Sequence, residues 1–233
     1  MTMTAANRLI VALDTPDLAS AVRLAKRLQG VVRYVKIGSI LFTAEGPPAI
    51  RCLRRMGFEV FLDLKFHDIP STVEQSCRAA VRHGVWMLTV HASGQPDMLK
   101  AAADAVRKEA VRLRVRRPRV VGVTVLTSVD GAPASLVQAH VLTLAAQAKR
   151  AGLDGVVCSV HEARAVRQRF KTGFAIVCPG IRPSGGTAAD QRRIATPAAA
   201  LQQGASVLVV GRPITQAGDP RRAALAMLQQ MKG

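Results

Sequence analysis

The sequence predicts an α/β fold, a single-domain (β/α)8 TIM barrel that spans residues 1–233. Three observations lead to this prediction. Eight short runs rich in Val, Ile and Leu recur along the chain, and segments with helical periodicity separate them. A length of 233 residues accommodates eight strand and helix units, near the lower end of the size range of such barrels. No linker rich in Ser, Gly and Pro interrupts the series, so we expect one domain.

The predicted strands are continuous apolar runs rather than alternating ones. Such runs are typical of strands covered on both faces, as in a parallel sheet, and their alternation with helices indicates right-handed βαβ units. The predicted strands cover residues 9–13, 31–37, 58–64, 85–90, 120–126, 155–159, 174–177 and 206–210.

Capping residues indicate where several intervening helices begin and end. Asp17 precedes a predicted helix over residues 18–28, and a Pro-Ser-Thr segment at 70–72 opens another over residues 73–82. Asp219 and Pro220 open the last helix. Residues 179–196 contain several Gly and Pro residues and predict a long loop before a short helix near 197–203. Loops of that length often carry function.

Basic residues greatly outnumber acidic ones. The chain has 33 Lys and Arg against 15 Asp and Glu, a formal net charge of +18, while aromatic residues make up only 3%. Such a surplus favours an anionic partner: a phosphorylated metabolite, nucleic acid or an acidic membrane surface.

Cysteine usage and hydropathy predict the compartment. The four cysteines lack the paired spacing of a zinc site and are too sparse for a disulfide framework, so we expect them to be reduced. The N-terminal residues show no basic stretch ahead of an apolar one, and no apolar run approaches the roughly 18 residues that cross a membrane. We therefore expect a soluble, cytoplasmic protein.

Charged residues lie at the ends of three successive predicted strands: Asp14 at the first, Lys36 at the second, and Asp63, Lys65 and Asp68 at the third. The carboxyl ends of barrel strands form the active site, and strand alternation places Asp63 and Lys65 on one face. Two carboxylates close together repel by roughly 4 kcal/mol at an effective dielectric near 20, so a cation, Lys65 or a metal, must lie between Asp63 and Asp68 if both approach one point. An ordinary solvated ion pair would explain any one of these charged residues, but their occurrence at three successive strand ends favours an active site.

The last predicted strand supplies a second signal. It runs into Gly211 and Arg212, at the place where many barrels bind a phosphate group through backbone N–H groups. Glycine permits close approach of a ligand to the backbone, and an arginine adds a charge-assisted bidentate contact. We therefore predict an anion site after the eighth strand.

Residues 63–72, DLKFHDIPST, resemble the signature of the orotidine 5′-phosphate decarboxylase family. Six further segments resemble other blocks of that family in the same order: residues 8–14, 34–38, 123–128, 179–183, 190–193 and 211–215. The resemblance covers nearly the whole chain. It implies a homodimeric (β/α)8 enzyme without a cofactor that converts orotidine 5′-monophosphate to uridine 5′-monophosphate and CO2 in pyrimidine synthesis.

The resemblance also implies roles for individual residues. Lys65 would protonate carbon 6 of the pyrimidine, within a charged array formed with Lys36, Asp63 and Asp68. Asp68 and Thr72 would reach into the site of the neighbouring subunit. The implied substrate-binding residues are Asp14, Lys36, Asp63, Ile69, Thr72, Thr127, Arg182, Gln191, Gly211 and Arg212, with Asp14 and Lys36 at the ribose, Thr127 at the pyrimidine, and Arg182, Gln191, Gly211 and Arg212 at the phosphate.

Two alternatives remain at this point. Phosphosugar enzymes of the same superfamily, 3-keto-L-gulonate 6-phosphate decarboxylase and hexulose 6-phosphate synthase, share the spacing of Asp63, Lys65 and Asp68 but bind Mg²⁺ and have Glu where this chain has Lys36. An ammonium cannot ligate a hard cation, so Lys36 favours the metal-free decarboxylase.

The other alternative is a barrel that binds nucleic acid and has lost catalysis. Only the net charge and a basic run, from Lys100 through Arg119, support it. We expect that run at the end of the barrel opposite the site. A single Trp and a single Tyr offer little base stacking, so nucleic acid is not the expected partner.

Overall fold

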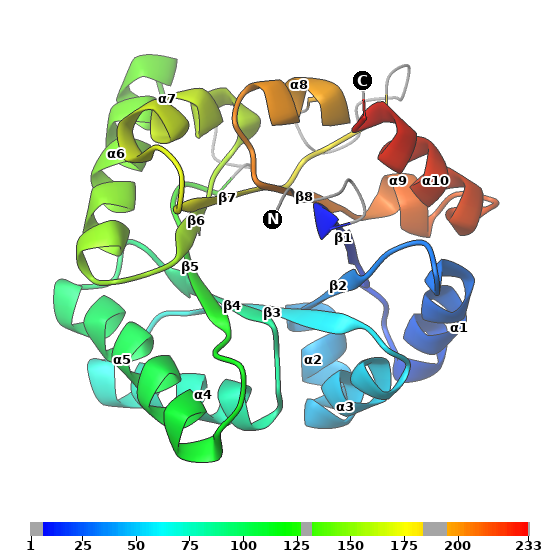
Figure 1. Ribbon diagram of the computed structural model, residues 1–233, viewed down its shortest axis with the longest axis horizontal. Coiled ribbons are helices and arrows are strands. Elements are labelled where there is room, and N and C mark those ends of the chain that lie inside the picture. The colour runs from blue at the N-terminus through cyan, green and yellow to red at the C-terminus, as the bar shows by residue number, and fades with distance from the viewer. Residues whose placement is uncertain (1–6, 127–131, 184–194, 233) are drawn as a thin grey trace.

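Eight parallel strands close into a barrel in the order β1 to β8, with β1 paired to both β2 and β8 (Figure 1). The computed structural model describes residues 7–126, 132–183 and 195–232. The strands are β1 (Leu9–Ala12), β2 (Tyr34–Gly38), β3 (Glu59–Phe66), β4 (Met87–His91), β5 (Arg119–Val123), β6 (Gly155–Val157), β7 (Ala175–Cys178) and β8 (Val207–Val210).

Helices surround the barrel as an outer ring (Figure 1). They are α1 (Leu18–Leu28), α2 (Ser39–Glu45), α3 (Pro47–Arg55), α4 (Pro70–Arg82), α5 (Pro96–Leu113), α6 (Ala134–Arg150), α7 (Val160–Phe170), α8 (Pro197–Gln202), α9 (Arg212–Thr215) and α10 (Pro220–Gln230). This arrangement confirms the predicted (β/α)8 fold.

Capping contacts confirm the predicted starts of α1 and α10, whereas α4 begins at Pro70, three residues before the predicted start. The Asp17 carboxylate accepts a hydrogen bond from the Ser20 amide at the start of α1. The Asp219 carboxylate accepts from the amides of Arg221 and Arg222 at the start of α10, and Pro70 is the first residue of α4. Proline suits a first helical position because the missing N–H would have no partner there.

The strand ends differ from the prediction by up to three residues, and β2, β5 and β3 illustrate the differences. Strand β2 begins at Tyr34 rather than at residue 31, because Val31 and Val32 still form a turn whose amides bond to the carbonyl of Leu28. Strand β5 ends at Val123, three residues early, and β3 continues two residues further, to Phe66. Apolar runs extend into adjoining turns, so their length alone does not define the strand ends.

The core consists of two layers. One lies between the strands and the helices and contains residues such as Val35, Leu62 and Leu88. The other fills the barrel interior with the side chains of Ile10, Ala12, Tyr34, Phe61, Trp86, Met87, Val121, Val177, Val207 and Val209. The single Tyr and the single Trp of the sequence pack there against each other, with ring centroids 4.2 Å apart.

Within the described ranges, no helix is long and apolar enough to cross a membrane.

Candidate active site

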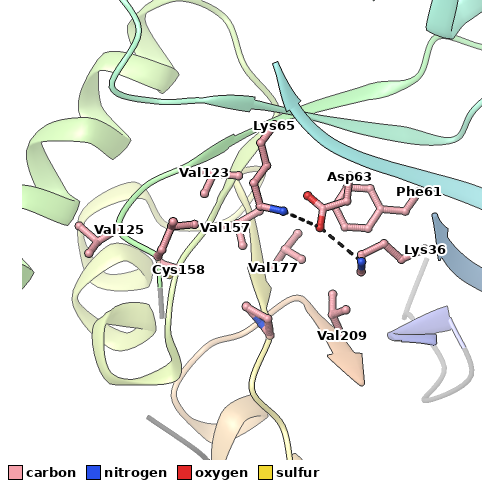
Figure 2. A pocket seen from close by; sticks show the side chains of 12 residues that line it. Lys36, Phe61, Asp63, Lys65, Val123, Val125, Val157, Cys158, Val177 and Val209 are labelled. Atoms are coloured by element: carbon pink, nitrogen blue, oxygen red, sulfur yellow. Dashed lines mark hydrogen bonds and ion pairs between the residues drawn. The ribbon is translucent and has the colours of Figure 1, made fainter. Parts of the chain in front are cut away.

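Four charged side chains alternate in sign across the carboxyl ends of β1, β2 and β3. The Lys36 ammonium lies 2.9 Å from an Asp14 oxygen and 3.5 Å from Asp63 Oδ2, and the Lys65 ammonium lies 3.0 Å from the same Asp63 oxygen. Figure 2 shows Lys36 and Lys65 both pointing toward Asp63. The side chains of Lys36 and Asp63 are only 10% and 14% exposed, so their mutual attraction is weakly screened by water. The structure thus brings together four of the residues predicted from strand ends.

Thr89 of β4 holds this array in place and was not among the predicted site residues. Its hydroxyl donates to Asp63 Oδ1 at 3.1 Å and accepts the backbone N–H of Lys65 at 2.8 Å. The side chain is almost completely buried. Both carboxylate oxygens of Asp63 therefore have partners. Oδ2 contacts the ammonium groups of Lys36 and Lys65, and Oδ1 accepts the hydrogen bond from the Thr89 hydroxyl. A buried polar residue in the middle of an apolar strand is the sequence signal that could have identified Thr89.

A bulge in β3 presents Asp63 and Lys65 at the mouth. Leu62 pairs with Leu88 and Phe66 pairs with Val90, so three residues of β3 face a single residue of β4. Lys65 takes a left-handed backbone conformation, φ 52°, which a residue other than Gly or Asn adopts at a cost of about 1–3 kcal/mol. The bonds through Thr89 offset that strain. Such bulges occur often beside active sites, where they redirect a side chain.

Gly38 leaves room for the Lys36 and Asp14 pair. A Cβ atom at this position would lie 2.8 Å from Lys36 Nζ and 2.9 Å from Asp14 Oδ1, closer than real Cβ atoms approach other atoms. Glycine at the end of β2 therefore lets Lys36 and Asp14 pair without displacement, and its own backbone angle does not call for glycine.

Two adjacent cavities open at this end of the barrel. The first, about 170 Å³, has the Lys65 and Asp63 pair on one side and apolar walls that include Val123, Val157 and Val177 (Figure 2). The second, about 190 Å³, is lined by Asp14, Arg182, Gly211, Arg212 and others. Lys36, Pro179 and Val209 line both cavities, so the charged array borders a hollow made of two adjoining parts, one apolar and one cationic.

The buried guanidinium group of Arg182 is a candidate anion-binding group. The residue is 9% exposed, and its Nε is buried without a hydrogen-bond partner within the described ranges. Its backbone N–H bonds to the Ala195 carbonyl at 3.0 Å, which fixes the start of the loop after β7. A buried guanidinium N–H without an acceptor is unfavourable, and a bound oxyanion would satisfy it.

Asp68, Ile69 and Thr72 do not join this array within one chain. All three are exposed, and the Asp68 carboxylate accepts a hydrogen bond from the adjacent Ile69 amide. Ile69 leaves 63% of its surface exposed, and Ile40, which follows β2, leaves 56% exposed. Thr127 and Gln191, predicted to contact the pyrimidine and the phosphate, lie outside the described residues.

Two histidines stack beside the array without entering it. The rings of His67 and His91 have centroids 5.3 Å apart. Burial, with smaller contributions from the charges of His67 and Lys65, lowers the pKa of His91 below its usual value of 6.5. A neutral imidazole does not add positive charge next to Lys65.

The fold and the site define a (β/α)8 barrel whose mouth carries an alternating lysine and aspartate array beside an arginine-lined hollow. Residues 7–227 match the family described as "Orotidine 5′-phosphate decarboxylase / HUMPS family". The chain belongs to this family, which confirms the resemblance seen in its sequence.

Individual relatives agree over nearly the whole chain. The chain is 49% identical to the orotidine 5′-phosphate decarboxylase of Moorella thermoacetica, covering 99% of this chain and 94% of that protein. It is 50% identical to the orotidine 5′-phosphate decarboxylase of Halorhodospira halophila, covering 96% of this chain and 95% of that protein. The crystal structure of the Lactobacillus acidophilus orotidine 5′-phosphate decarboxylase superimposes with a TM-score of 0.84 at 34% identity, covering 97% of this chain and 99% of that chain.

Proposed function

We propose that this protein decarboxylates orotidine 5′-monophosphate to uridine 5′-monophosphate and CO2 in pyrimidine synthesis. The observation that carries the proposal is the hollow with two parts, in which a lysine and aspartate array borders both an apolar cavity and a cavity lined by Arg182 and Arg212. A pyrimidine ring suits the apolar part, and a 5′-phosphate suits the cationic part. The names of the relatives at about half identity support the same substrate.

Lys65 is the proposed proton donor. When CO2 leaves, the electron pair of the broken carbon–carbon bond stays on carbon 6 of the pyrimidine. An ammonium next to that carbon stabilises the developing negative charge and then transfers a proton to it, which completes uridine 5′-monophosphate and leaves a neutral lysine to be reprotonated from water. Asp63, 3.0 Å from Lys65 Nζ, keeps this lysine charged and directed.

The remaining residues bind the substrate away from the reacting carbon. Asp14 and Lys36, paired at 2.9 Å at the boundary of the two cavities, suit the ribose hydroxyls. Arg182, Gly211 and Arg212 suit the phosphate. Gln191 and Thr127, which lie outside the described residues, are proposed to contact the phosphate and the pyrimidine edge. Binding energy gathered at the phosphate end aligns carbon 6 with Lys65 and so contributes to the rate.

A second copy of the chain completes the site in this proposal. Asp68 and Thr72, with Ile69 beside them, would contact the site of the partner subunit. Their exposure in the single chain, and the two exposed isoleucines after β2 and β3, are consistent with a surface that another subunit covers.

The proposed reaction needs no metal or organic cofactor. Lys36 Nζ lies between carboxylates of Asp14 and Asp63, where it supplies the positive charge that a cation would otherwise bring. This placement favours the decarboxylase over the Mg²⁺-dependent phosphosugar enzymes. Full activity in EDTA is the expected result, and strict dependence on Mg²⁺ would contradict it.

We also propose a cytoplasmic location and no role for nucleic acid. None of the four cysteines, all of which lie within the described residues, forms a disulfide, as expected in a reducing compartment. The single Trp and Tyr are 5% and 6% exposed inside the barrel, where they cannot stack on bases.

The decisive experiment replaces the proposed proton donor. Lys65→Ala should lower kcat for orotidine 5′-monophosphate at least about 1000-fold while uridine 5′-monophosphate still binds. Lys100→Ala, which removes an exposed lysine from α5, is the matched control and should retain full activity. Substantial turnover by Lys65→Ala would refute the assignment.

A further inference from the structure

A third cavity lies at the opposite end of the barrel, where the strands begin. It has a volume of about 460 Å³ and lies among the starts of β3, β4 and β5 and the ends of α3, α4 and α5. Its charged lining residues are Arg54, Glu59, Arg82, Arg116 and Arg117. Because active-site residues occupy the other ends of the strands, this cavity is separate from the mouth and takes no part in the proposed reaction.

The arginines around this cavity outnumber the carboxylates that balance them. Only Arg117 has a carboxylate of its own, that of Asp154, within the described part of the chain. Glu59 is shared by Arg116 at 3.6 Å and Arg33 at 3.2 Å.

The two other lining arginines are also incompletely balanced. Arg82 shares the buried Glu109 carboxylate with Arg78 and Arg112. Arg54 donates to the carbonyl of His83 at 3.3 Å and forms no ion pair with any described residue. The ends of α3, α4 and α5 each contribute roughly half a negative charge, which is less than the excess of guanidinium groups around them.

Backbone geometry positions these arginines at the cavity. Gly84 has φ 69°, and a Cβ atom there would collide with the Arg54 guanidinium, so glycine lets Arg54 lie directly over the chain. Arg114 ends α5 in a left-handed conformation, φ 54° and ψ 40°. This turn redirects the chain so that Val115 and Arg116 line the cavity.

One side of the cavity is apolar. Val85, Leu113 and Val115 line it, and Val115 leaves 47% of its surface exposed. Trp86 forms part of the wall and has Arg119 over its ring at 5.7 Å. A hollow that combines arginines with an apolar wall differs from an ordinary solvated basic surface, because it can bind a charged group and an organic group at once.

We propose that this cavity binds a small molecule with a diphosphate or triphosphate group, such as a nucleotide, with the phosphates on Arg54, Arg82 and Arg116 and the organic part against Val85 and Val115. Guanidinium groups match phosphate oxygens in paired hydrogen bonds, and arginines from three separate elements suit a chain of phosphates better than a single one. The volume lies within the range of small-molecule sites, about 300–1,000 Å³.

Calorimetric titration at low salt with inorganic triphosphate and with ATP tests the proposal. We expect saturable binding of both probes and tighter binding of ATP, because its organic part contacts the apolar wall; equal affinity of the two probes would contradict the contact with Val85 and Val115. The double variant Arg54→Gln/Arg116→Gln should weaken binding about tenfold or more, because it removes two charge-assisted contacts from exposed residues. Val115→Glu, which keeps every arginine, should weaken it as well.

Control variants locate the site. Arg164→Gln changes an exposed arginine of α7 and should alter the affinity less than about twofold. With the mouth filled by saturating uridine 5′-monophosphate, Arg212→Gln should leave triphosphate binding unchanged, and the double variant should keep full decarboxylase activity. Absence of saturable binding, equal weakening in Arg164→Gln, or weakening only in Arg212→Gln would overturn the proposal.

Discussion

Asp63 is the residue on which the contacts of the site converge. Its two oxygens bind two ammonium groups and a hydroxyl, and it lies between Lys36 and the proposed proton donor, Lys65. A carboxylate held on both oxygens cannot rotate away from Lys65 without breaking several bonds. Rigid placement of this kind lowers the reorganisation needed in the transition state.

Thr89 acts through Asp63 and Lys65 as a positioning residue. Thr89→Val keeps the shape but removes the hydroxyl, and a hydrogen bond to a charged group contributes about 1.5–3 kcal/mol. We expect kcat to fall about 10- to 100-fold with little change in KM. Steady-state kinetics measure this split. Thr89→Ser restores the hydroxyl and should recover most of the rate, whereas an unchanged kcat in Thr89→Val would exclude the positioning role.

Gly38 makes a second prediction at the residue scale. Gly38→Ala forces a Cβ atom onto Lys36 Nζ and Asp14 Oδ1, both at the ends of side chains that can move. The array should therefore open without unfolding the barrel, and kcat/KM should fall about tenfold or more. Gly218→Ala is the matched control, since a Cβ atom there meets nothing within 4 Å. Equal activity of the two variants would show that the Lys36 and Asp14 pair is dispensable.

At the scale of elements, Glu109 joins helices α4 and α5. Its buried carboxylate accepts hydrogen bonds from Arg78 and Arg82 of α4 and from Arg112 of α5. The hydrogen bonds from Arg112 and Arg82 lower the pKa of Glu109 from 4.5 to about 2. The charged form of Glu109 is therefore favoured by the folded state.

This lowered pKa predicts how stability depends on pH. The contribution of Glu109 should be complete above its unfolded pKa of 4.5 and should disappear as the pH falls toward about 2. Glu109→Gln should thus lower the melting temperature at pH 7, with a difference from the unmodified protein that shrinks in acid. Asp104→Asn, which breaks a more exposed pair with Arg107, should have a smaller effect. Thermal unfolding followed from pH 7 to pH 2.5 measures the effect of each variant on the melting temperature. A difference between Glu109→Gln and the unmodified protein that does not change with pH would contradict the stabilising role of ionised Glu109.

The sequence predicted the elements better than the details of the site. Apolar runs and caps located all eight strands and the helices α1, α4 and α10, because periodicity and capping are local properties. The bulge at Lys65 depends on pairing with β4, and the role of Thr89 depends on the same register, which a single sequence does not reveal. Asp14, Lys36, Asp63 and Lys65 could be predicted because they lie at the carboxyl ends of strands, and these ends meet in any parallel barrel.

At the scale of the whole molecule, the barrel separates the two groups of basic residues. Lys36, Lys65, Arg182 and Arg212 lie at the mouth, while the arginines between α5 and β5 lie around the opposite cavity. Strand direction alone produces this separation, because residues after strands and residues before strands belong to opposite ends of the barrel. The net charge of +18 therefore does not describe a single surface.

The proposed sharing of active sites between the two subunits of a dimer can be tested with mixed dimers. If Asp68 acts in the site of the partner subunit, Lys65→Ala and Asp68→Asn inactivate different sites of a mixed dimer: one site carries both changes and the other carries neither. Two nearly inactive variants, mixed in equal amounts and allowed to exchange subunits, should then recover about a quarter of the unmodified activity, since half of the dimers are mixed and each has one intact site. Mixing Lys65→Ala with Asp63→Asn, two residues of the same site in one chain, should recover nothing, because every site of that mixture carries a change. Decarboxylation measured during subunit exchange distinguishes the arrangements, and failure of the first mixture despite proven exchange would place Asp68 outside the partner's site.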